Sequence, residues 1–474
     1  MSFIGREHEL SQLYEFDRRR SAGLVVVCGR RRIGKSTLIE HFARKKKLYE
    51  FYGIAPRTGI SNKDQLKHFG ELLGGQFGMA PLVFNNWNEA LSMLATLTAH
   101  GPAIILLDEI SWMAGSDKDF AGKLKGIWDT KFKKNNELIL ILCGSVTSWI
   151  EENILEDKGY VGRISLTLKL QEMTLFDANQ FWLGNELIDD TEKLKLLCVT
   201  GGIPRYLEEI DPKQTAEQNI KRLCFTPEGV LFREFDKIFK DIFEKRAEAY
   251  KLIIEKLASQ SCEYNQLAKK LNLEQTGGLS TQIKYLIASG FVTRDYSWKK
   301  SGERSKLSRL RLSDNYIRFY LKYIEPKKEL IEKGLYRDIA LENLPQWNII
   351  MGLQFENLVL NNLPSIISML NIPAESILAT GPYFQRKTIR QEGCEIDLLI
   401  YTRFTLYVCE IKFRKSIKSE VIHEVQEKIR RLKKHPSISI RPVLIYHGKL
   451  DATVSRSDFF ANKIKFSEML YKKF

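Results

Sequence analysis

Short apolar runs alternate with amphipathic stretches along the first third of the chain. The runs LVVVCG, AIILLD and LILILCGS are rich in branched apolar residues, which is typical of strands buried in a parallel sheet. LYEFYGIA predicts one further strand, between the first two along the chain. Residues near 62–74, 87–99 and 117–133 predict helices from their apolar spacing. This alternation predicts an α/β core with a parallel sheet over residues 1–170.

The pattern changes after residue 170. Residues 171–240 are predicted to be helical. Within 241–312, three short amphipathic helices are followed by strands, which is the pattern of a winged helix. Residues 313–345 predict a tyrosine- and lysine-rich helical connector. In 346–474 an amphipathic helix precedes the strands EIDLLI and LYVCEIKF, a basic helix and a last strand. The chain is therefore predicted to have several domains, which its 474 residues also favour.

Composition narrows the class of protein. Hydrophobic residues make up 44% and charged residues 28%, which is ordinary for packed domains and argues against a disordered chain. The segment MSFIGREHEL has no apolar core of a secretory signal, and the longest apolar runs are too short to cross a bilayer. Seven single cysteines without a CxxC pair support neither zinc sites nor disulfides. We therefore predict a cytoplasmic protein with no membrane partner.

The chain is strongly basic. It has 73 Lys and Arg against 58 Asp and Glu, a formal net charge of +15, and its pI is near 9.2. Such a balance favours a polyanionic partner such as nucleic acid or an acidic membrane surface. A solvated basic face without a partner is the alternative.

A phosphate-binding loop follows the first strand. LVVVCGRRRIGKSTLIEHFA places GxxxxGKS between a strand and a helix, the context that supports a Walker A motif. Its glycines allow the backbone close to phosphates, Lys35 would reach the β and γ phosphates, and Ser36 would place its hydroxyl on Mg²⁺. The predicted cofactors are ATP and Mg²⁺. The predicted nucleotide-binding residues of this loop are Gly29, Arg30, Arg31, Arg32, Ile33, Gly34, Lys35, Ser36 and Thr37.

AIILLDEI supplies the matching Walker B motif. Asp108 at the end of the apolar strand is predicted to hold the magnesium water shell, and Glu109 to orient the attacking water. Ser145, at the end of LILILCGS, would sense the γ-phosphate or would simply cap the next helix. Lys35, Glu109 and Ser145 are therefore the candidate catalytic residues of an ATPase.

A strand added between the two motifs, together with the acidic pair, is similar to the AAA+ and STAND ATPases that use a catalytic glutamate. FIGREHEL resembles the segment of that group that contacts adenine, and GGIPRYL resembles its lid motif, which implies that Pro204 approaches the base. Arg163 lies where an arginine finger or switch arginine could be, although a surface arginine is the alternative. Arg205 is the one candidate for a second sensor arginine.

The predicted winged helix has a basic hairpin but a poor recognition helix. Helix residues offer only Lys284 and Gln282 for reading bases. Nonspecific phosphate contact, or a mechanical link between domains, is therefore predicted ahead of a repressor-like function. The basic residues of the hairpin, opposed only by Glu303 and Asp314, are Lys299, Lys300, Arg304, Lys306, Arg309 and Arg311.

The C-terminal strand pair carries two acids. A turn centred between Arg403 and Phe404 pairs Thr402 with Thr405, and the same register places Asp397 opposite Glu410. Lys412 points to the same face. Because two like charges in this geometry repel, we predict that Mg²⁺ or Mn²⁺ lies between them and that Lys412 orients water or neutralises phosphate. The alternative is a surface hairpin with solvated charges.

This spacing resembles the PD-(D/E)XK nucleases, whose core has the order αβββαβ. Here Ile396 replaces the usual proline before the aspartate. The resemblance implies that Glu356, on the preceding helix, joins Asp397 and Glu410 as a metal ligand, and that Asp397, Glu410 and Lys412 are catalytic. Positive charge that could guide a phosphate backbone surrounds this face, opposed by three glutamates: Lys412, Arg414, Lys415, Lys418, Lys428, Arg430, Arg431, Lys433 and Lys434.

The order of these motifs resembles archaeal-type P-loop ATPases of the AAA+/STAND group that end in a nuclease-like domain of unknown function. The implied fold class is α/β multidomain, with an AAA+-like core, a helical lid (171–240), a winged helix and a PD-(D/E)XK nuclease-like domain. The implied function is ATP hydrolysis coupled to a metal-dependent nuclease acting on nucleic acid, with DNA favoured, through the basic wing and the C-terminal basic helix. A homo-oligomer is possible. The alternative is a nucleotide-driven switch or scaffold with an inactive nuclease-like domain.

Overall fold

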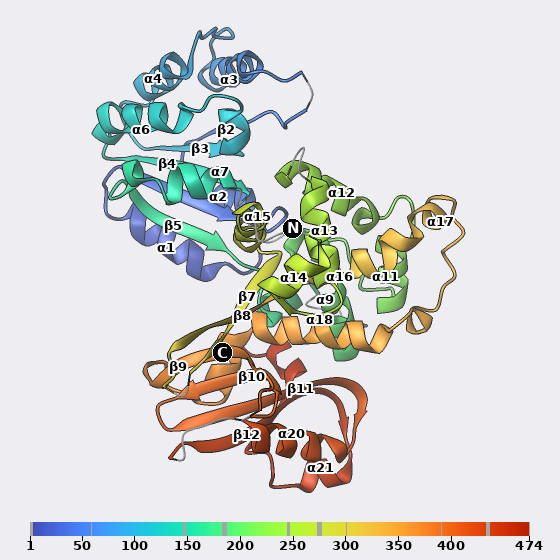
Figure 1. Ribbon diagram of the computed structural model, residues 1–474. Coiled ribbons are helices and arrows are strands. Elements are labelled where there is room, and N and C mark those ends of the chain that lie inside the picture. The colour runs from blue at the N-terminus through green and yellow to red at the C-terminus, as the bar shows by residue number, and fades with distance from the viewer. Residues whose placement is uncertain are drawn as a thin grey trace. The chain divides into compact units, whose positions relative to one another are not determined.

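The computed structural model describes residues 3–57, 59–145, 148–182, 187–243, 247–272, 277–299, 301–389, 391–432 and 437–473. The chain forms two compact units, which we describe separately (Figure 1). The first unit comprises Met1–Gln171, Lys237–Ala247 and Lys284–Gly290, and the second comprises Glu172–Asp236, Glu248–Ile283 and Phe291–Phe474.

The first unit is built on a parallel sheet, as the sequence predicts. Its strand order is β2-β3-β4-β1-β5, with all neighbouring pairs parallel. The run LYEFY forms β2 at the edge of the sheet, and β4 separates the Walker A strand β1 from the Walker B strand β3. The strands are β1 Gly23–Gly29, β2 Leu48–Tyr52, β3 Ala103–Asp108, β4 Leu138–Ser145 and β5 Ile164–Leu170.

Helices α3, α4 and α6 gather at one side of this sheet (Figure 1). Ser61 and Asn86 cap the first turns of α3 and α4 with their side chains, which fixes where these helices begin. Trp87 packs edge-on against both Phe69 and Phe120, so one aromatic cluster joins the three helices over the sheet. The helices of this unit include α1 Glu7–Asp17, α2 Lys35–Ala43, α3 Asn62–Phe77, α4 Trp87–Leu97, α5 Ile110–Ala114, α6 Phe120–Thr130 and α7 Ser148–Ile150.

The second unit begins with short helices and a small antiparallel sheet of order β6-β8-β7. The hairpin β7–β8 packs on strand β9 of the C-terminal sheet, where the Ser297 hydroxyl donates to the Phe384 carbonyl at 2.7 Å. The segments Lys237–Ala247 and Lys284–Gly290, at the ends of α12 and α15, belong to the first unit. The elements up to this sheet are α8 Leu175–Asn179, α9 Asp190–Thr200, α10 Pro204–Leu207, α11 Ala216–Cys224, α12 Val230–Phe243, α13 Ala247–Leu257, β6 Cys262–Glu263, α14 Tyr264–Lys270, α15 Gly277–Ala288, β7 Val292–Trp298 and β8 Arg304–Leu312.

The predicted connector is part of the core of the second unit. It forms α16 Asn315–Phe319, irregular helical turns and α17 Lys328–Glu332. Tyr316 and Tyr320 are fully buried. The Tyr316 hydroxyl donates to the Leu231 carbonyl at 2.6 Å, which satisfies its polar end.

The C-terminal part contains the predicted order of one helix, three strands, a helix and a strand, followed by an additional strand. The sheet order is β13-β12-β11-β10-β9; β9, β10 and β11 are antiparallel, and β11, β12 and β13 are parallel. Its elements are α18 Trp347–Asn361, α19 Leu363–Met369, β9 Ile377–Gln385, β10 Cys394–Thr402, β11 Thr405–Ile417, α20 Glu420–Arg431, β12 Ser439–Leu450, α21 Ala452–Arg456 and β13 Asn462–Lys465.

The state of the cysteines and the length of the apolar helices can be compared with what the composition predicts. All seven cysteines are buried free thiols. Among the residues described, none of the helices has the length and apolar character needed to cross a membrane.

Candidate nucleotide site and acidic centre

The phosphate-binding loop joins β1 to the first turn of α2. Gly34, the residue before α2, has a left-handed φ of 89°, which favours glycine. A Cβ atom on Gly29 would lie 2.8 Å from the Leu170 carbonyl oxygen, so a side chain there would displace β5. Both glycines of the motif are thus required by the backbone. Between them, Arg32 also has a positive φ and Ile33 is buried.

Walker A and Walker B residues meet at the end of the sheet. Lys35 is buried, and its ammonium donates to the carbonyls of Gly29 at 3.2 Å and Arg30 at 3.3 Å. The Ser36 hydroxyl donates to Asp108 Oδ2 at 2.8 Å. A hydroxyl and a carboxylate in contact are the oxygen donors that suit Mg²⁺, so these residues fit the predicted ion. Thr37 is exposed in the same turn of α2.

Both the backbone and the carboxylate of Glu109 are held in place by hydrogen bonds. It has a left-handed φ of 47° before α5, and its amide donates to Asp108 Oδ1 at 2.9 Å. Its carboxylate accepts from the Ser145 amide at 3.4 Å. Burial raises the pKa of Glu109 above its usual value, with Lys35 opposing and Asp108 adding to the shift. A carboxylate with a raised pKa is better able to accept a proton from water.

Arg6 supports the loop from outside the motif, a role that sequence reasoning did not assign. It is buried, and its guanidinium donates to the carbonyls of Ile33 at 3.1 Å and Gln171 at 2.7 Å. It also pairs with Glu9 at 3.1 Å. The only sequence signal was its place within FIGREHEL, the segment expected to contact adenine.

The predicted arginines are engaged by neighbouring acids. Arg163 forms a two-pronged ion pair with Asp129, with nitrogen-to-oxygen distances of 2.8 and 3.0 Å, and this pair lowers the pKa of the Asp129 carboxyl. Arg205 pairs with Glu208 and Glu209. A finger or sensor role would require each arginine to leave these partners. Pro204 begins α10 in the second unit, and its approach to the base stays a prediction.

The acidic strand pair has the predicted register. Leu398 pairs with Cys409 and Tyr401 with Leu406, and continuing by one residue places Asp397 opposite Glu410. The Ile411 amide donates to Asp397 Oδ2 at 2.9 Å, which holds this carboxylate against β11. The two acids predicted from the sequence therefore converge.

The cation between these acids is a lysine side chain, which corrects the expectation that only a metal could balance them. The Lys428 ammonium, from α20, lies 2.6 Å from Glu410 Oε2 and 3.3 Å from Asp397 Oδ1. From the sequence, Lys428 is expected among the positive charges that surround this face, and not between the two acids. The sequence does not show which side of α20 faces the sheet, so it could not show that Lys428 points toward the two acids.

Lys412 also lies at this centre, as predicted. Its ammonium is 2.7 Å from Glu410 Oε1 and 3.0 Å from Glu424 Oε2, so Glu410 accepts one lysine on each oxygen. Burial and the nearby Asp397 raise the pKa of Glu410, although both lysines oppose this. Burial alone would lower the pKa of Lys412 and Lys428, but the carboxylates raise it.

Glu356 does not join the two acids in a set of three ligands, contrary to the prediction. Within the described ranges, no group of three or more His, Cys, Asp or Glu side chains could hold a metal ion. Instead, Glu356 and Asp397 line a cavity of about 120 Å³ that also contains Arg311 and Arg318. Burial and Asp397 raise the pKa of Glu356 to about 8. The helix α18 thus directs this acid into a cavity lined by both arginines and acids.

We expect Glu356 to make the protein less stable at alkaline pH. Its pKa is about 8 in the fold against 4.5 for the free side chain, so between these values the folded chain holds a proton that the unfolded chain releases. Stability from this group therefore falls as pH rises through that window. Glu356→Gln should raise the thermal unfolding temperature, by an amount that grows with pH until the carboxyl ionises in the fold.

A matched control for this prediction is Glu375→Gln, since Glu375 is exposed. Its unfolding temperature should follow wild type at every pH. Parallel curves for Glu356→Gln and wild type would contradict the raised pKa.

The predicted basic wing is largely neutralised. Arg309 pairs with Glu395 at 2.7 Å, and Arg311 pairs with Asp295 at 2.7 Å. Lys299 pairs with Glu303, and the Arg304 guanidinium lies over the Tyr296 ring. Lys306 is exposed, and Lys300 lies outside the described residues. On the predicted recognition helix, Lys284 pairs with Glu156 within the first unit at 2.8 Å.

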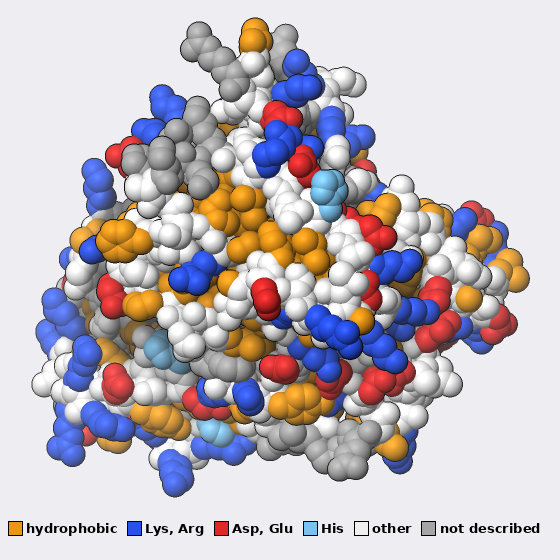
Figure 2. All heavy atoms as spheres, turned by 90° about the horizontal axis from the view of Figure 1, so that it is seen from below, with side chains coloured by type: hydrophobic (Ala, Val, Ile, Leu, Met, Phe, Trp, Pro, Cys, Tyr) orange, Lys and Arg blue, Asp and Glu red, His pale blue; other side chains and the backbone are white. Residues whose placement is uncertain are grey.

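The basic helix α20 is neutralised in the same way. Besides Lys428, Arg430 pairs with Glu392 and Glu427, and Arg431 pairs with Glu427. Lys433 and Lys434 lie outside the described residues. Figure 2 shows Lys and Arg side chains interspersed with Asp and Glu over the face in view. The net positive charge of the chain therefore does not form a continuous basic surface on β7, β8 and α20.

Comparison with known proteins agrees with the geometry of the loop. Residues 3–210 match a family model described as an ATPase domain predominantly from Archaea. Together with the phosphate loop, the parallel sheet and the Ser36–Asp108 contact, this match decides the class of the N-terminal part. Residues 3–210 are a P-loop ATPase domain. ATP is accordingly its nucleotide, as the sequence predicted.

A second family model, described as archaeal and bacterial proteins of unknown function, matches residues 320–426. This range follows the ATPase domain and contains Glu356, Asp397, Glu410 and Lys412. An uncharacterized protein of Methanocaldococcus jannaschii is 26% identical over 403 residues, covering 84% of each chain. The ATPase domain and the acidic centre thus lie in segments matched by two different families.

Two solved structures are similar to this chain. A Walker-type ATPase of Pyrococcus abyssi is 16% identical with a TM-score of 0.48, covering 67% of this chain and 96% of its own. The Aeropyrum pernix ORC2 protein, in ADPNP–ADP complexes, is 15% identical with a TM-score of 0.40, covering 70% of this chain and 96% of its own.

Proposed function

We propose that the ATPase domain hydrolyses ATP with Ser36 and Asp108 holding Mg²⁺ and Glu109 polarising the attacking water. The contact of Ser36 with Asp108 at 2.8 Å is the observation that carries this assignment. Bound Mg²⁺ supplies charge neutralisation on the phosphates. Lys35 lies buried over the loop to meet the β and γ phosphates, and the Ser145 amide holds Glu109 in place until a γ-phosphate is bound.

For the second unit, we propose a PD-(D/E)XK-type centre that acts on nucleic acid. The convergence of Asp397, Glu410 and Lys412 on one face supports it. Two carboxylates are enough for Mg²⁺ when water and a substrate phosphate complete the shell, so Asp397 and Glu410 fit Mg²⁺ or Mn²⁺ as ligands. The ion would supply Lewis-acid activation of a phosphodiester. Lys412 stays bonded to Glu410 and presents its charge to the scissile phosphate.

Lys428 favours a second candidate function. Because its ammonium already bridges the two ligands, the centre is closed to a metal in this conformation. A nucleotide-driven switch or scaffold, in which this domain binds DNA or a protein without cutting, agrees with that observation. The helices α13 to α15 with β6 to β8 would then be a winged helix with a mechanical role, since its cations are paired within the chain.

One experiment separates the two candidates. Plasmid DNA, linear DNA and RNA are incubated with the full chain, Mg²⁺ or Mn²⁺, and with or without ATP. If the nuclease function is correct, one polymer is cut, Asp397→Asn abolishes cutting and leaves ATP turnover unchanged, and Lys35→Ala removes ATP turnover. If every polymer stays uncut in every condition while ATP turnover is normal, the nuclease function is excluded and the switch or scaffold function is the one that stays.

A further inference from the structure

A cavity of about 850 Å³ lies within the second unit, away from the acidic centre. It is lined by residues of α9, of α18, of the last part of β11 and of the end of β12, and by Tyr471. Phe413 lines it, and since side chains alternate along β11, Phe413 points to the face opposite to Glu410 and Lys412. The cavity is therefore a separate site on the other face of the sheet.

The inner wall of this cavity is aromatic and apolar. Trp182, Trp347 and Met351 are buried side chains of the lining. Phe413 stacks between Phe355, at 4.9 Å, and His447, at 5.7 Å between ring centroids. Aromatic surfaces of this kind offer stacking contacts to a planar ligand.

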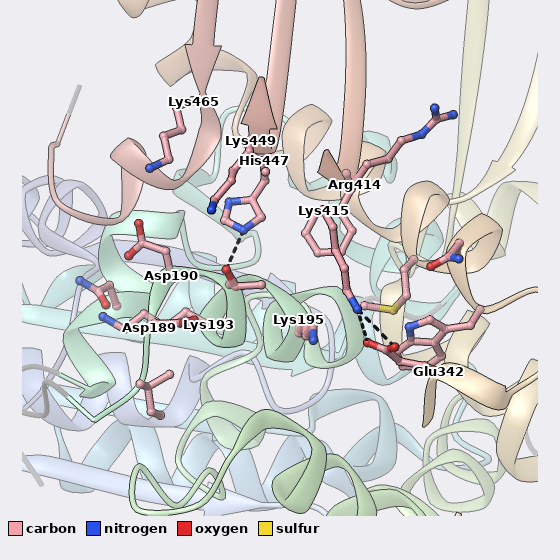
Figure 3. Close-up of a pocket in the computed structure, with 18 of the residues that line it drawn as sticks. Asp189, Asp190, Lys193, Lys195, Glu342, Arg414, Lys415, His447, Lys449 and Lys465 are labelled. Atoms are coloured by element: carbon pink, nitrogen blue, oxygen red, sulfur yellow. Dashed lines mark hydrogen bonds and ion pairs between the residues drawn. The ribbon is translucent and has the colours of Figure 1, made fainter. Parts of the chain in front are cut away.

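Several lysine side chains lie around this wall (Figure 3). The acids of the lining already have hydrogen-bond or ion-pair partners. Lys195, Lys449 and Lys465 form no side-chain hydrogen bond or ion pair with the rest of the described chain. The acids of the lining are already used: Asp189 caps α9, Asp190 accepts the Tyr471 hydroxyl at 2.5 Å, and Glu342 pairs with Lys415 at 3.3 Å. The uncommitted charge of the cavity is positive, which favours an anion.

Three buried polar atoms of the lining have no hydrogen-bond partner among the described residues. They are the Trp182 indole nitrogen, the Asn179 carbonyl oxygen and His447 Nδ1. The other ring nitrogen of His447 is 3.1 Å from the Thr191 hydroxyl, and the Asn179 amide donates to the Leu470 carbonyl at 3.0 Å. These three atoms are covered by neighbouring atoms and do not face the cavity, so they are not contacts for a bound ligand.

We propose that this cavity binds an aromatic phosphate of nucleotide size, with its ring against the aromatic part of the lining and its phosphate held by Lys195, Lys449 and Lys465. The volume lies within the range of roughly 300–1,000 Å³ usual for small-ligand sites. This ligand is a second molecule, distinct from the ATP of the phosphate loop.

The test uses full-length Lys35→Ala protein, so that the phosphate loop no longer competes. Titration calorimetry with ATP, GTP and AMP should show one remaining site per chain. Adenosine and pyrophosphate should each bind at least tenfold more weakly, because each offers only half of the recognised chemistry. Adding Lys195→Ala, Lys449→Ala and Lys465→Ala should weaken nucleotide binding at least tenfold.

The control adds Lys45→Ala, Lys63→Ala and Lys67→Ala, which are exposed lysines of the first unit, and should bind as the parent does. The proposal is overturned if no mononucleotide binds, if the triple lysine variant binds normally, if pyrophosphate binds as tightly as ATP, or if only an oligonucleotide binds.

Discussion

Glu109→Gln is expected to reduce ATP turnover by roughly 10²- to 10⁴-fold, the contribution usual for a positioned general base. The amide keeps the size of the side chain but cannot accept a proton from water. Binding of ATP should stay close to wild type, because Lys35 and Ser36, not Glu109, lie at the phosphate loop. Single-turnover hydrolysis and equilibrium binding of a fluorescent ATP analogue measure the two effects separately.

Lys35→Ala is the matched comparison for this prediction. It should lose nucleotide binding together with hydrolysis, because the buried ammonium lies against the phosphate-binding loop. If Glu109→Gln turned over ATP at the wild-type rate, another group would have to activate the water, and the assignment of Glu109 would be wrong.

Lys428→Ala is expected to destabilise the second unit by about 3–5 kcal/mol, the usual cost of removing one partner from a buried ion pair. The change leaves Asp397 and Glu410 facing each other, with Glu410 only 2% exposed as a side chain. The loss should be larger at pH 8 than at pH 5. At the lower pH Glu410 can take up a proton, since burial and Asp397 already raise its pKa. Urea unfolding at both pH values measures it.

Divalent metal gives this prediction a second readout. Mg²⁺ or Mn²⁺ should restore stability to Lys428→Ala, since an ion that binds only the folded state stabilises it by mass action. Wild type should respond far less, because its own ammonium occupies the place of the ion. Manganese binding followed by electron paramagnetic resonance reports the same difference without any assay of cutting.

Lys418→Ala is the control, because Lys418 is an exposed lysine just before α20. It should change neither stability nor metal response. A stable Lys428→Ala protein that ignores metal would show that the acids need no cation besides Lys412. Equal metal binding by wild type would show that the centre is open, and would favour the nuclease over the switch.

The local features of the sequence determined much of this fold. The runs around Val26, Leu106 and Ile141 predict the strands because an apolar run of this length can only be buried, and the spacing of Gly29, Gly34 and Lys35 requires a strand before it and a helix after it. The two-residue turn at Arg403 and Phe404 fixed the register that places Asp397 opposite Glu410. These are short-range relations, which the order of residues is sufficient to set.

Tertiary structure alone decided which charged side chains are paired within the chain and which can bind a ligand. Lys428 lies 31 residues from Asp397 along the chain and pairs with it only because α20 packs against β10 and β11. The same holds for Arg309 with Glu395, for Glu356 in the cavity that it shares with Asp397, and for the residues that line the larger cavity. The sequence by itself determined that this protein has a phosphate loop and a pair of facing acids. Only long-range packing decided that a lysine closes those acids and that a second, basic cavity exists, because both depend on side chains brought together from distant segments.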